Sequence, residues 1–272
     1  MEAVKTYNKL SEEYNRLFTE NTLQFQKNGI DTLQAEAKYT SFYPSFGIKE
    51  GEKCKFLIYG QAADTWGKTF TIGTDQSEII NDIDKCINYS NEYYEAKDHS
   101  PLDWVNVFWS NRTYTDYAQL KEEKPFYEEM KYRTSRSFFW RVTYKLISDY
   151  YNFDRESWEW SKKLIWSNLY KIAPTNDNPN DIECSNQEKC AIQLVKKEIE
   201  EINPEYCIVI TNGDWWLPFQ KELNSNKIPH ENLPSEIAFY EQYNNTKIIV
   251  TTRPFFGDDE QHVEQILQLI KG

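Results

Sequence analysis

The stretch Lys55–Gly73, KFLIYGQAADTWGKTFTIG, determines how the rest of the chain is interpreted. Its apolar residues Phe56–Tyr59 run directly into Gly60, which predicts a short buried strand followed by a polar loop. In open α/β sheets, ligands bind just beyond the carboxyl ends of such strands, because the loops there vary while the sheet holds them still. We therefore expect functional side chains in this loop, the candidates being Gln61, Asp64 and Phe70.

Three further apolar segments have the length of buried strands, namely 164–170, 206–211 and 247–252, and a short extra strand is expected at 236–240. Between these strands, apolar residues recur at helical spacing. The predicted helices span 7–28, 75–94, 135–151, 186–202, 214–223 and 259–270. Residues 30–53 and the loop after residue 170 are expected to be irregular.

Core strands that alternate with helices are typical of a mostly parallel sheet covered on both faces. We therefore predict the α/β class, as a three-layer α/β/α sandwich with a central, mostly parallel four-stranded sheet. Residues 1–272 are expected to form a single domain, with an N-terminal helix and an insertion at about 75–155.

The composition limits the function classes. A formal net charge of −12 argues against sequence-blind binding to long nucleic acids, which needs a broad cationic face, although a local cationic cleft stays open. No stretch approaches the roughly 18 apolar residues of a membrane span, and the charged N-terminus is unlike a secretory signal. The five cysteines lack CxxC spacing and are expected to be reduced. We expect a cytoplasmic protein with no membrane partner, no metal and no cofactor.

Polar residues follow three of the four predicted core strands. Gln61 and Asp64 follow the first strand, Asn168 lies in the second, and Thr252 and Arg253 end the fourth. Parallel strands end at the same edge of a sheet, so these side chains are expected to lie close together. An asparagine amide carries both a donor and an acceptor, and arginine is a permanent cation.

Two motifs surround the first two predicted strands. The first is a strand, a glycine and a Gly-x-x-Phe element, here Gly60 and Gly67–Phe70. The second is a strand that ends in Ser167-Asn168 and continues through Lys171 to Pro174, followed by the Asn-x-x-Pro loop Asn176–Pro179.

Two later motifs complete the pattern. A helix ends in Ile-x-Pro before a buried strand, at Glu200–Ile210, and the last strand leads to Arg253-Pro254-Phe255. In this order, the four motifs resemble those of the uracil-DNA glycosylase superfamily, nearest to its thermophilic bacterial and archaeal branches. That family has His-Pro-Ser at the last motif, and its iron–sulfur cysteines are absent here.

The resemblance implies a role for each matched residue. Asn168 would read the Watson–Crick edge of a flipped uracil, with Phe70 stacked on the base and Gly60 in the same binding loop. Asp64 would orient the attacking water, and Gln61 would act through its side chain or its backbone N–H. The implied partner is DNA that contains uracil, or a small nucleobase ligand.

Several of these residues also have a purely structural interpretation. Trp66 either lines a groove or packs in the core, and Phe70 is equally well a core ring. Asn168 would then bond only to loop backbone, and Asp64 would cap a turn. Arg253, in place of the family's histidine, supplies positive charge without shuttling a proton at neutral pH.

Three functions therefore remain open. The first is a glycosylase that hydrolyses the N-glycosidic bond of uracil or another altered base, for which we expect a local basic rim formed by Lys68, Arg133, Arg136, Lys171 and Arg253. The second is a non-repair relative that binds a nucleobase, nucleotide or small ligand without cleaving DNA. The third is an interaction protein with a vestigial pocket. Among the histidines, only His262 lies near a motif, and it is expected at the surface.

Overall fold

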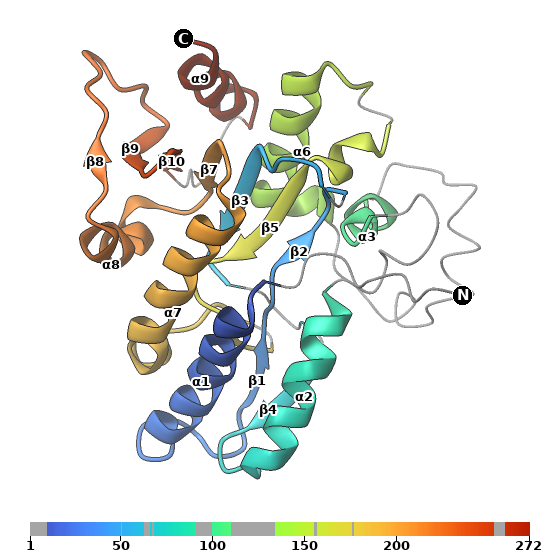
Figure 1. Ribbon diagram of the computed structural model, residues 1–272, viewed down its shortest axis with the longest axis vertical. Helices are drawn as coiled ribbons and strands as arrows, with labels where there is room; N and C mark the ends of the chain where they lie inside the picture. The colour runs from blue at the N-terminus through green and yellow to red at the C-terminus, as the bar shows by residue number, and fades with distance from the viewer. Residues whose placement is uncertain are drawn as a thin grey trace.

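The computed structural model describes residues 10–49, 51–62, 66, 68–90, 100–109, 134–154, 157–175, 177–252 and 259–272. Within these residues the chain forms a seven-stranded sheet, a three-stranded sheet and the helices around them. Figure 1 shows the large sheet in the upper part of the molecule, with helices α1 (Glu12–Gly29) and α2 (Gln76–Tyr89) in the lower part.

The strand order of the large sheet is β2-β5-β3-β7-β10-β9-β8. Its central strands run parallel to one another. They are β5 (Leu164–Asn168), β3 (Phe56–Gly60), β7 (Tyr206–Val209) and β10 (Thr246–Thr251). Each coincides with one of the four apolar segments, so the predicted α/β fold with parallel strands is confirmed.

Antiparallel strands extend this sheet on both sides. Strand β2 (Ser45–Phe46) pairs with β5, while β9 (Ile237–Tyr243) pairs with β10 and β8 (Asn226–Lys227) pairs with β9. The sheet therefore has seven strands rather than the predicted four. The sequence does predict β9, but β2 and β8 are too short to show a periodic pattern.

The small sheet has the order β4-β1-β6 and is antiparallel. Its strands are β1 (Lys38–Ser41), β4 (Thr69–Thr71) and β6 (Ile172–Pro174). The expectation of irregular structure at 30–53 and after residue 170 was wrong, because these short strands form only through pairing with segments far away in the sequence. Strand β1 thereby ties the segment that follows β3 to the segment that follows β5.

Besides α1 and α2, the structure has the predicted helices α6 (Phe138–Tyr151), α7 (Asp181–Ile202), α8 (Gly213–Leu223) and α9 (Asp259–Lys271). The short helix α3 (Asp103–Val107) was not predicted. Helix α7 begins earlier than the apolar spacing predicts. Its start is set by a capping box, in which the Asn180 side chain accepts from the Glu183 backbone N–H and Glu183 accepts from the Asn180 N–H. Residues 75–155, the expected insertion, contribute α2, α3 and α6.

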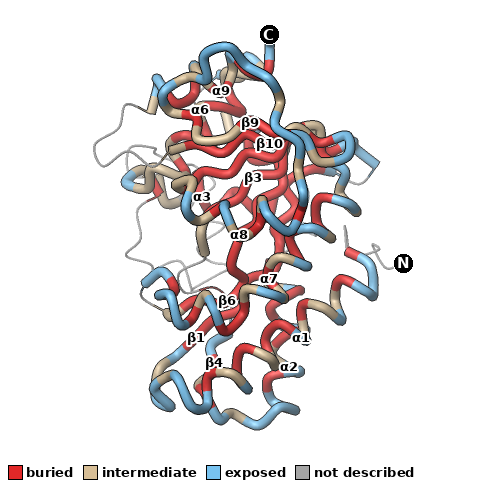
Figure 2. The backbone as a smooth tube through the Cα atoms, turned by 90° about the vertical axis from the view of Figure 1, so that its left-hand side faces the viewer, coloured by how far each residue is buried: buried red, intermediate tan, exposed pale blue. Residues whose placement is uncertain are grey.

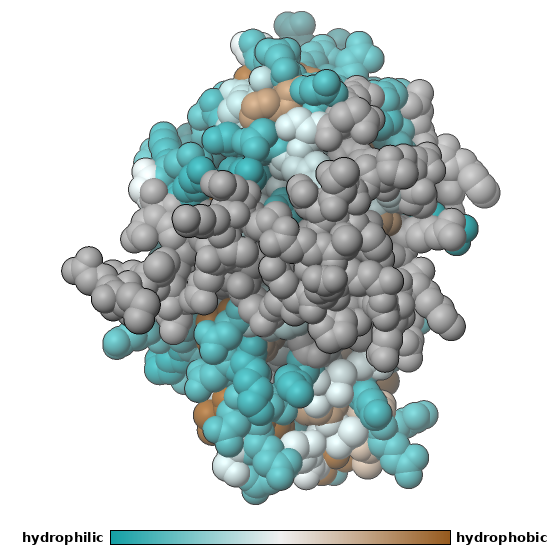
Figure 3. Space-filling model, turned by 90° about the vertical axis from the view of Figure 1, so that its right-hand side faces the viewer, coloured by the Kyte–Doolittle hydropathy of each residue, from teal (hydrophilic) through white to brown (hydrophobic). Residues whose placement is uncertain are grey.

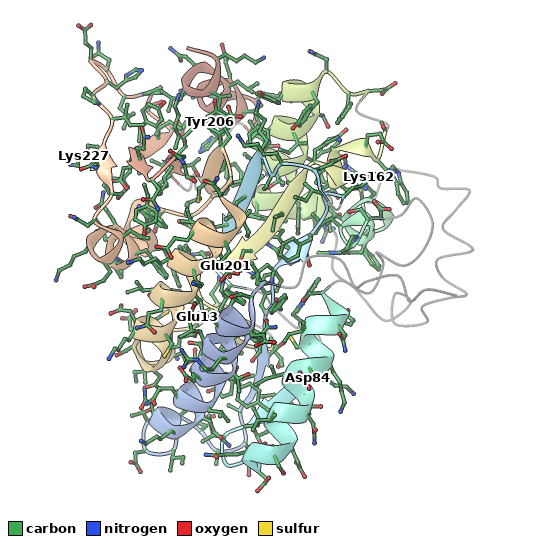
Figure 4. The ribbon with its side chains drawn as sticks, viewed as in Figure 1. Glu13, Asp84, Lys162, Glu201, Tyr206 and Lys227 are labelled. Carbon is green, nitrogen blue, oxygen red and sulfur yellow. The ribbon has the colours of Figure 1, made fainter. Side chains whose placement is uncertain are left out.

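Helix α1 lies along α7. Figure 4 shows Glu13 of α1 and Glu201 of α7 where the two helices meet, and the Lys197 Nζ lies 2.7 Å from Glu13 and 3.6 Å from Glu201. Exposed ion pairs of this kind contribute little to stability. The fully buried Tyr14 joins the two helices more firmly, because its hydroxyl donates to Glu198 of α7.

Burial follows the strands. Figure 2 shows β3, β9 and β10 as a buried centre, whereas exposed residues lie on the outer sides of the helices. On the face shown in Figure 3, the described surface is mostly hydrophilic, with apolar residues in small spots. In the part of the chain that the structure describes, no helix is long and apolar enough to cross a bilayer.

Gly47, the residue after β2, lies close to the backbone of Ser161 and Leu164, and this close approach can be tested. A Cβ at this position would lie 1.9 Å from the Ser161 carbonyl oxygen and 2.7 Å from that of Leu164, and backbone cannot easily yield. We expect Gly47→Ala to lower the free energy of unfolding in urea by at least about 3 kcal/mol, the upper range for overpacking.

Gly73→Ala is the matched control. Gly73 has a positive φ of 91° but nothing within 4 Å of an added Cβ, so only backbone strain of about 1–2 kcal/mol is expected. Equal losses for the two variants would contradict the close backbone approach at Gly47.

Candidate functional site

The carboxyl ends of β3 and β5 lie side by side. Gly60 pairs with Asn168 in the parallel register. Pairing continues beyond the strands, because the Leu169 N–H donates to the Gly60 carbonyl at 2.9 Å and the Tyr170 N–H donates to the Gln61 carbonyl at 3.0 Å. The structure therefore brings the backbone at Gly60 and Gln61 beside the segment that begins at Asn168. The expected meeting of the side chains with Asp64 and Arg253 stays a prediction.

The Asn168 side chain is packed against Gly60. A Cβ on residue 60 would lie 2.6 Å from the Asn168 Oδ1 and 3.4 Å from a ring carbon of Phe139, so a glycine leaves the space that the amide occupies. Asn168 is only 1% exposed. Its Nδ2 has no hydrogen-bond partner among the described residues. A buried donor without a partner costs free energy, and it is satisfied only by a group that brings an acceptor.

A buried lysine holds the backbone at Asn168. The Lys171 Nζ donates to the Asn168 carbonyl at 2.5 Å and to the Ser167 Oγ at 2.8 Å, and it lies 2.7 Å from the Glu198 Oε1. These three contacts use the three donors of the ammonium group. The expectation that Lys171 forms part of a basic rim was wrong, since its side chain is fully buried and paired.

Glu198 of α7 is the acceptor at the centre of this network. Its Oε2 accepts from the Tyr59 hydroxyl at 2.7 Å and from the Ser167 hydroxyl at 2.8 Å, and its Oε1 accepts from the Tyr14 hydroxyl. Burial, together with the charge of Glu198, raises the pKa of Tyr14 and Tyr59 well above the ordinary value. Burial also lowers the pKa of Lys171, and Glu198 opposes that shift.

Phe70 lies elsewhere in the packing. It belongs to β4, is 8% exposed, and its ring centroid lies 6.0 Å from Tyr39 of β1 and 6.4 Å from Phe25 of α1. These are the contacts of a core ring. Stacking of Phe70 on a bound base therefore stays a prediction that these contacts do not favour.

Trp66 packs into a cluster of four indoles. Its ring centroid lies 5.0 Å from Trp166 and 5.8 Å from Trp104, and its Nε1 donates to the Ser90 Oγ at 2.9 Å. Trp140 of α6 lies 4.8 Å from Trp166 and completes the cluster. These contacts correspond to the packing interpretation of Trp66.

The cluster borders Asn168. Trp166 and Asn168 are two residues apart in β5 and so project from the same face of the strand. Phe139, which approaches Gly60, lies 4.8 Å from Trp140 between ring centroids. Sequence reasoning missed Phe139, although the aromatic triplet Phe138–Trp140 at the start of a predicted helix was a usable signal.

Two expected catalytic residues, Asp64 and Arg253, lie outside the described residues. Thr252, the residue before Arg253, is fixed by hydrogen bonds. The Thr252 N–H donates to the Glu236 carbonyl at 2.8 Å, and the His262 Nε2 lies 3.2 Å from both the Thr252 carbonyl and the Glu236 Oε2. His262 is 1% exposed, so the expected surface position was wrong.

On the other side, Asp259 begins helix α9 and is clamped by α6. The Arg141 Nε and Nη2 donate to its two carboxylate oxygens at 2.8 and 3.0 Å, and the Lys145 Nζ lies 3.4 Å away. Burial alone would raise the pKa of Asp259, but the hydrogen bonds and charge of Arg141 and Lys145 outweigh it and hold the pKa below the ordinary value.

A metal site needs several His, Cys, Asp or Glu side chains close together. Among the described residues, no group of three or more His, Cys, Asp or Glu side chains is placed to hold a metal ion. The cysteines Cys54, Cys86, Cys184, Cys190 and Cys207 are free thiols.

Comparison of the sequence with protein-family models and with curated proteins finds no match. A functional assignment therefore depends on the geometry of the edge formed by Gly60, Gln61 and Asn168.

The buried pair of Lys171 and Glu198 gives a stability prediction. Lys171→Met leaves the Glu198 carboxylate buried without a cation, which typically costs about 3–5 kcal/mol. We expect this loss in urea unfolding at pH 7. The double variant Lys171→Met/Glu198→Gln is expected to recover most of it, because no uncompensated charge remains. A double variant as unstable as the single one would contradict the ion pair.

The two buried tyrosines give a pH prediction. Because the pKa of Tyr14 and Tyr59 is raised in the folded state, the unfolded chain loses these protons first as the pH rises above the ordinary value of 10.0. Their stabilising contribution is thus complete below pH 10 and falls above it, by about 1.4 kcal/mol per pH unit for each group.

We expect Tyr59→Phe to reduce the slope of unfolding free energy against pH above pH 10 by about that amount. Urea unfolding at a series of pH values measures the slope. Phe18→Leu, which removes no titratable group, is the control and should shift the curve without changing its slope. An unchanged slope for Tyr59→Phe would show that the hydroxyl titrates alike in both states.

Proposed function

We propose that this chain is a uracil-DNA glycosylase-like protein that acts in the cytoplasm and hydrolyses the N-glycosidic bond of uracil or another altered base in DNA. The proposal includes the finer architecture, a three-layer α/β/α sandwich whose functional centre is the four-stranded parallel part of the large sheet. Its partner would be uracil-containing DNA.

One observation carries the proposal: the Asn168 amide is held at the carboxyl edge of the parallel strands with its Nδ2 unpartnered. An amide presents a donor beside an acceptor, and uracil presents the complementary pair in its ring N–H and the neighbouring carbonyl. Cytosine has an amino group where uracil has that carbonyl, so its donor would face the Nδ2 donor. The arrangement therefore supports discrimination between the two bases.

The remaining roles follow from chemical type. Cleavage of the N-glycosidic bond leaves positive charge on the sugar and negative charge on the departing base. Asp64 would stabilise the sugar and orient the attacking water, and Arg253 would stabilise the base. Gln61 would contribute from the end of β3, where its carbonyl is already bonded to Tyr170.

Two features support a second candidate, a protein that binds a nucleobase or small ligand, or another protein, without cleaving DNA. The Asn168 amide is almost fully buried. Of the five cations expected to form a basic rim, Lys68 and Arg136 are exposed, whereas Lys171 is buried and Arg133 and Arg253 lie outside the described residues. The burial of Asn168 limits access of a DNA strand to the site, and the burial of Lys171 removes one of the expected rim cations.

The decisive experiment incubates the purified protein with single- and double-stranded oligonucleotides that contain one uracil, followed by alkaline cleavage of abasic sites. We expect abasic product from the wild type. Asn168→Ala removes the base-reading amide and should lower the rate at least tenfold, since loss of a hydrogen bond to a substrate costs about 1.5 kcal/mol or more.

Gly60→Ala is expected to act in the same direction, because the added Cβ displaces the Asn168 Oδ1. Asn226→Ala, in the exposed strand β8, is the matched control and should leave the rate unchanged. No abasic product from the wild type on either substrate would reject the glycosylase and leave the second candidate.

A further inference from the structure

An aromatic ring from helix α6 borders Gly60 together with the Asn168 amide. Two carbons of the Phe139 ring lie 3.4 and 3.6 Å from the position that a Cβ on Gly60 would take, and the Asn168 Oδ1 lies 2.6 Å from the same point. The ring and the amide therefore both lie beside Gly60, at the end of β3.

Phe139 differs from the other rings of this region in its exposure. Trp140 is 2% exposed and Trp166 is 6% exposed, whereas Phe139 is half-buried. The Phe139 ring nevertheless has a defined setting, because Trp140 contacts it edge-on, with an interplanar angle of 80°. It sits at the second residue of α6, whose start is fixed by the Ser137 cap.

Phe70 is the ring that the sequence motif predicts to stack on the base, but it packs against residues of α1 and β1. It is paired with Tyr39 in the antiparallel register of β1 and β4, and its ring packs against Phe25. Moving Phe70 onto a ligand would leave an unfilled space between α1 and the small sheet, which is costly in a packed core.

We infer that Phe139, and not Phe70, forms the aromatic wall of the site whose polar edge is Asn168, and that the ligand is a planar ring with a carbonyl acceptor beside an N–H. The inference rests on the proposed base-binding role of Asn168. Phe139 is partly exposed, and side chains that reach the solvent change rotamer readily, so its ring can adjust to a ligand. The bound ring then stacks on Phe139 and supplies the acceptor that the Asn168 Nδ2 lacks.

Binding of free uracil, measured by saturation-transfer and titration NMR, tests this inference separately from DNA cleavage. Stacking of a base on an aromatic side chain is worth about 1–3 kcal/mol, so Phe139→Leu is expected to weaken uracil binding roughly 5- to 150-fold. Phe139→Tyr keeps the ring and should bind within about threefold of the wild type. Cytosine should bind at least tenfold more weakly than uracil.

Phe70→Leu is the matched comparison. It opens a space in the core and should lower the melting temperature, while the folded protein keeps its affinity for uracil. Thermal melting of all variants shows that binding is compared among folded proteins.

Loss of uracil affinity in Phe70→Leu but not in Phe139→Leu would overturn the inference, and so would a wild type that binds neither base. Binding that depends on Phe139 in a protein that releases no uracil from DNA would support the inference while rejecting the glycosylase. The two proposals can therefore fail independently.

Discussion

The structure depends on one buried ion pair. Lys171 and Glu198 are fully buried, and hydroxyls of Tyr14, Tyr59 and Ser167 complete their hydrogen bonds. The pair joins α1, β3, α7 and the segment after β5 at a single point. Taking two charges out of water is expensive, and such pairs persist only when every donor and acceptor is satisfied. Here that requirement sets the position of the Asn168 backbone, to which Lys171 also donates.

Much of the fold could be predicted because the parallel core has a strong local signal. The central strands are continuous apolar runs, and the long helices have apolar stripes with recognisable caps. The small sheet could not be predicted, since β1, β4 and β6 are three or four residues long and exist only by pairing with one another. The same limit applies to β2 and β8.

The candidate site could be predicted only in part. That the ends of β3 and β5 lie side by side follows from their parallel direction, and the structure confirms it for the backbone of residues 60, 61 and 168–170. The contacts of Lys171, Phe70 and Phe139 depend on side-chain burial, which sequence does not encode locally: a lysine in a polar loop suggests solvent, yet here it faces a carboxylate. The expected surface position of His262 was wrong for the same reason. A polar helix residue can face the interior when a partner is present there, here the Glu236 carboxylate.

Strand β1 pairs on one side with β4 and on the other with β6. It thus fixes where the connections that leave β3 and β5 end, because both run into strands that pair with β1. An insertion within β1, β4 or β6 would shift this double pairing out of register. A protein built in this way would change its ligand preference by exchanging side chains on a constant framework, and not by remodelling its loops.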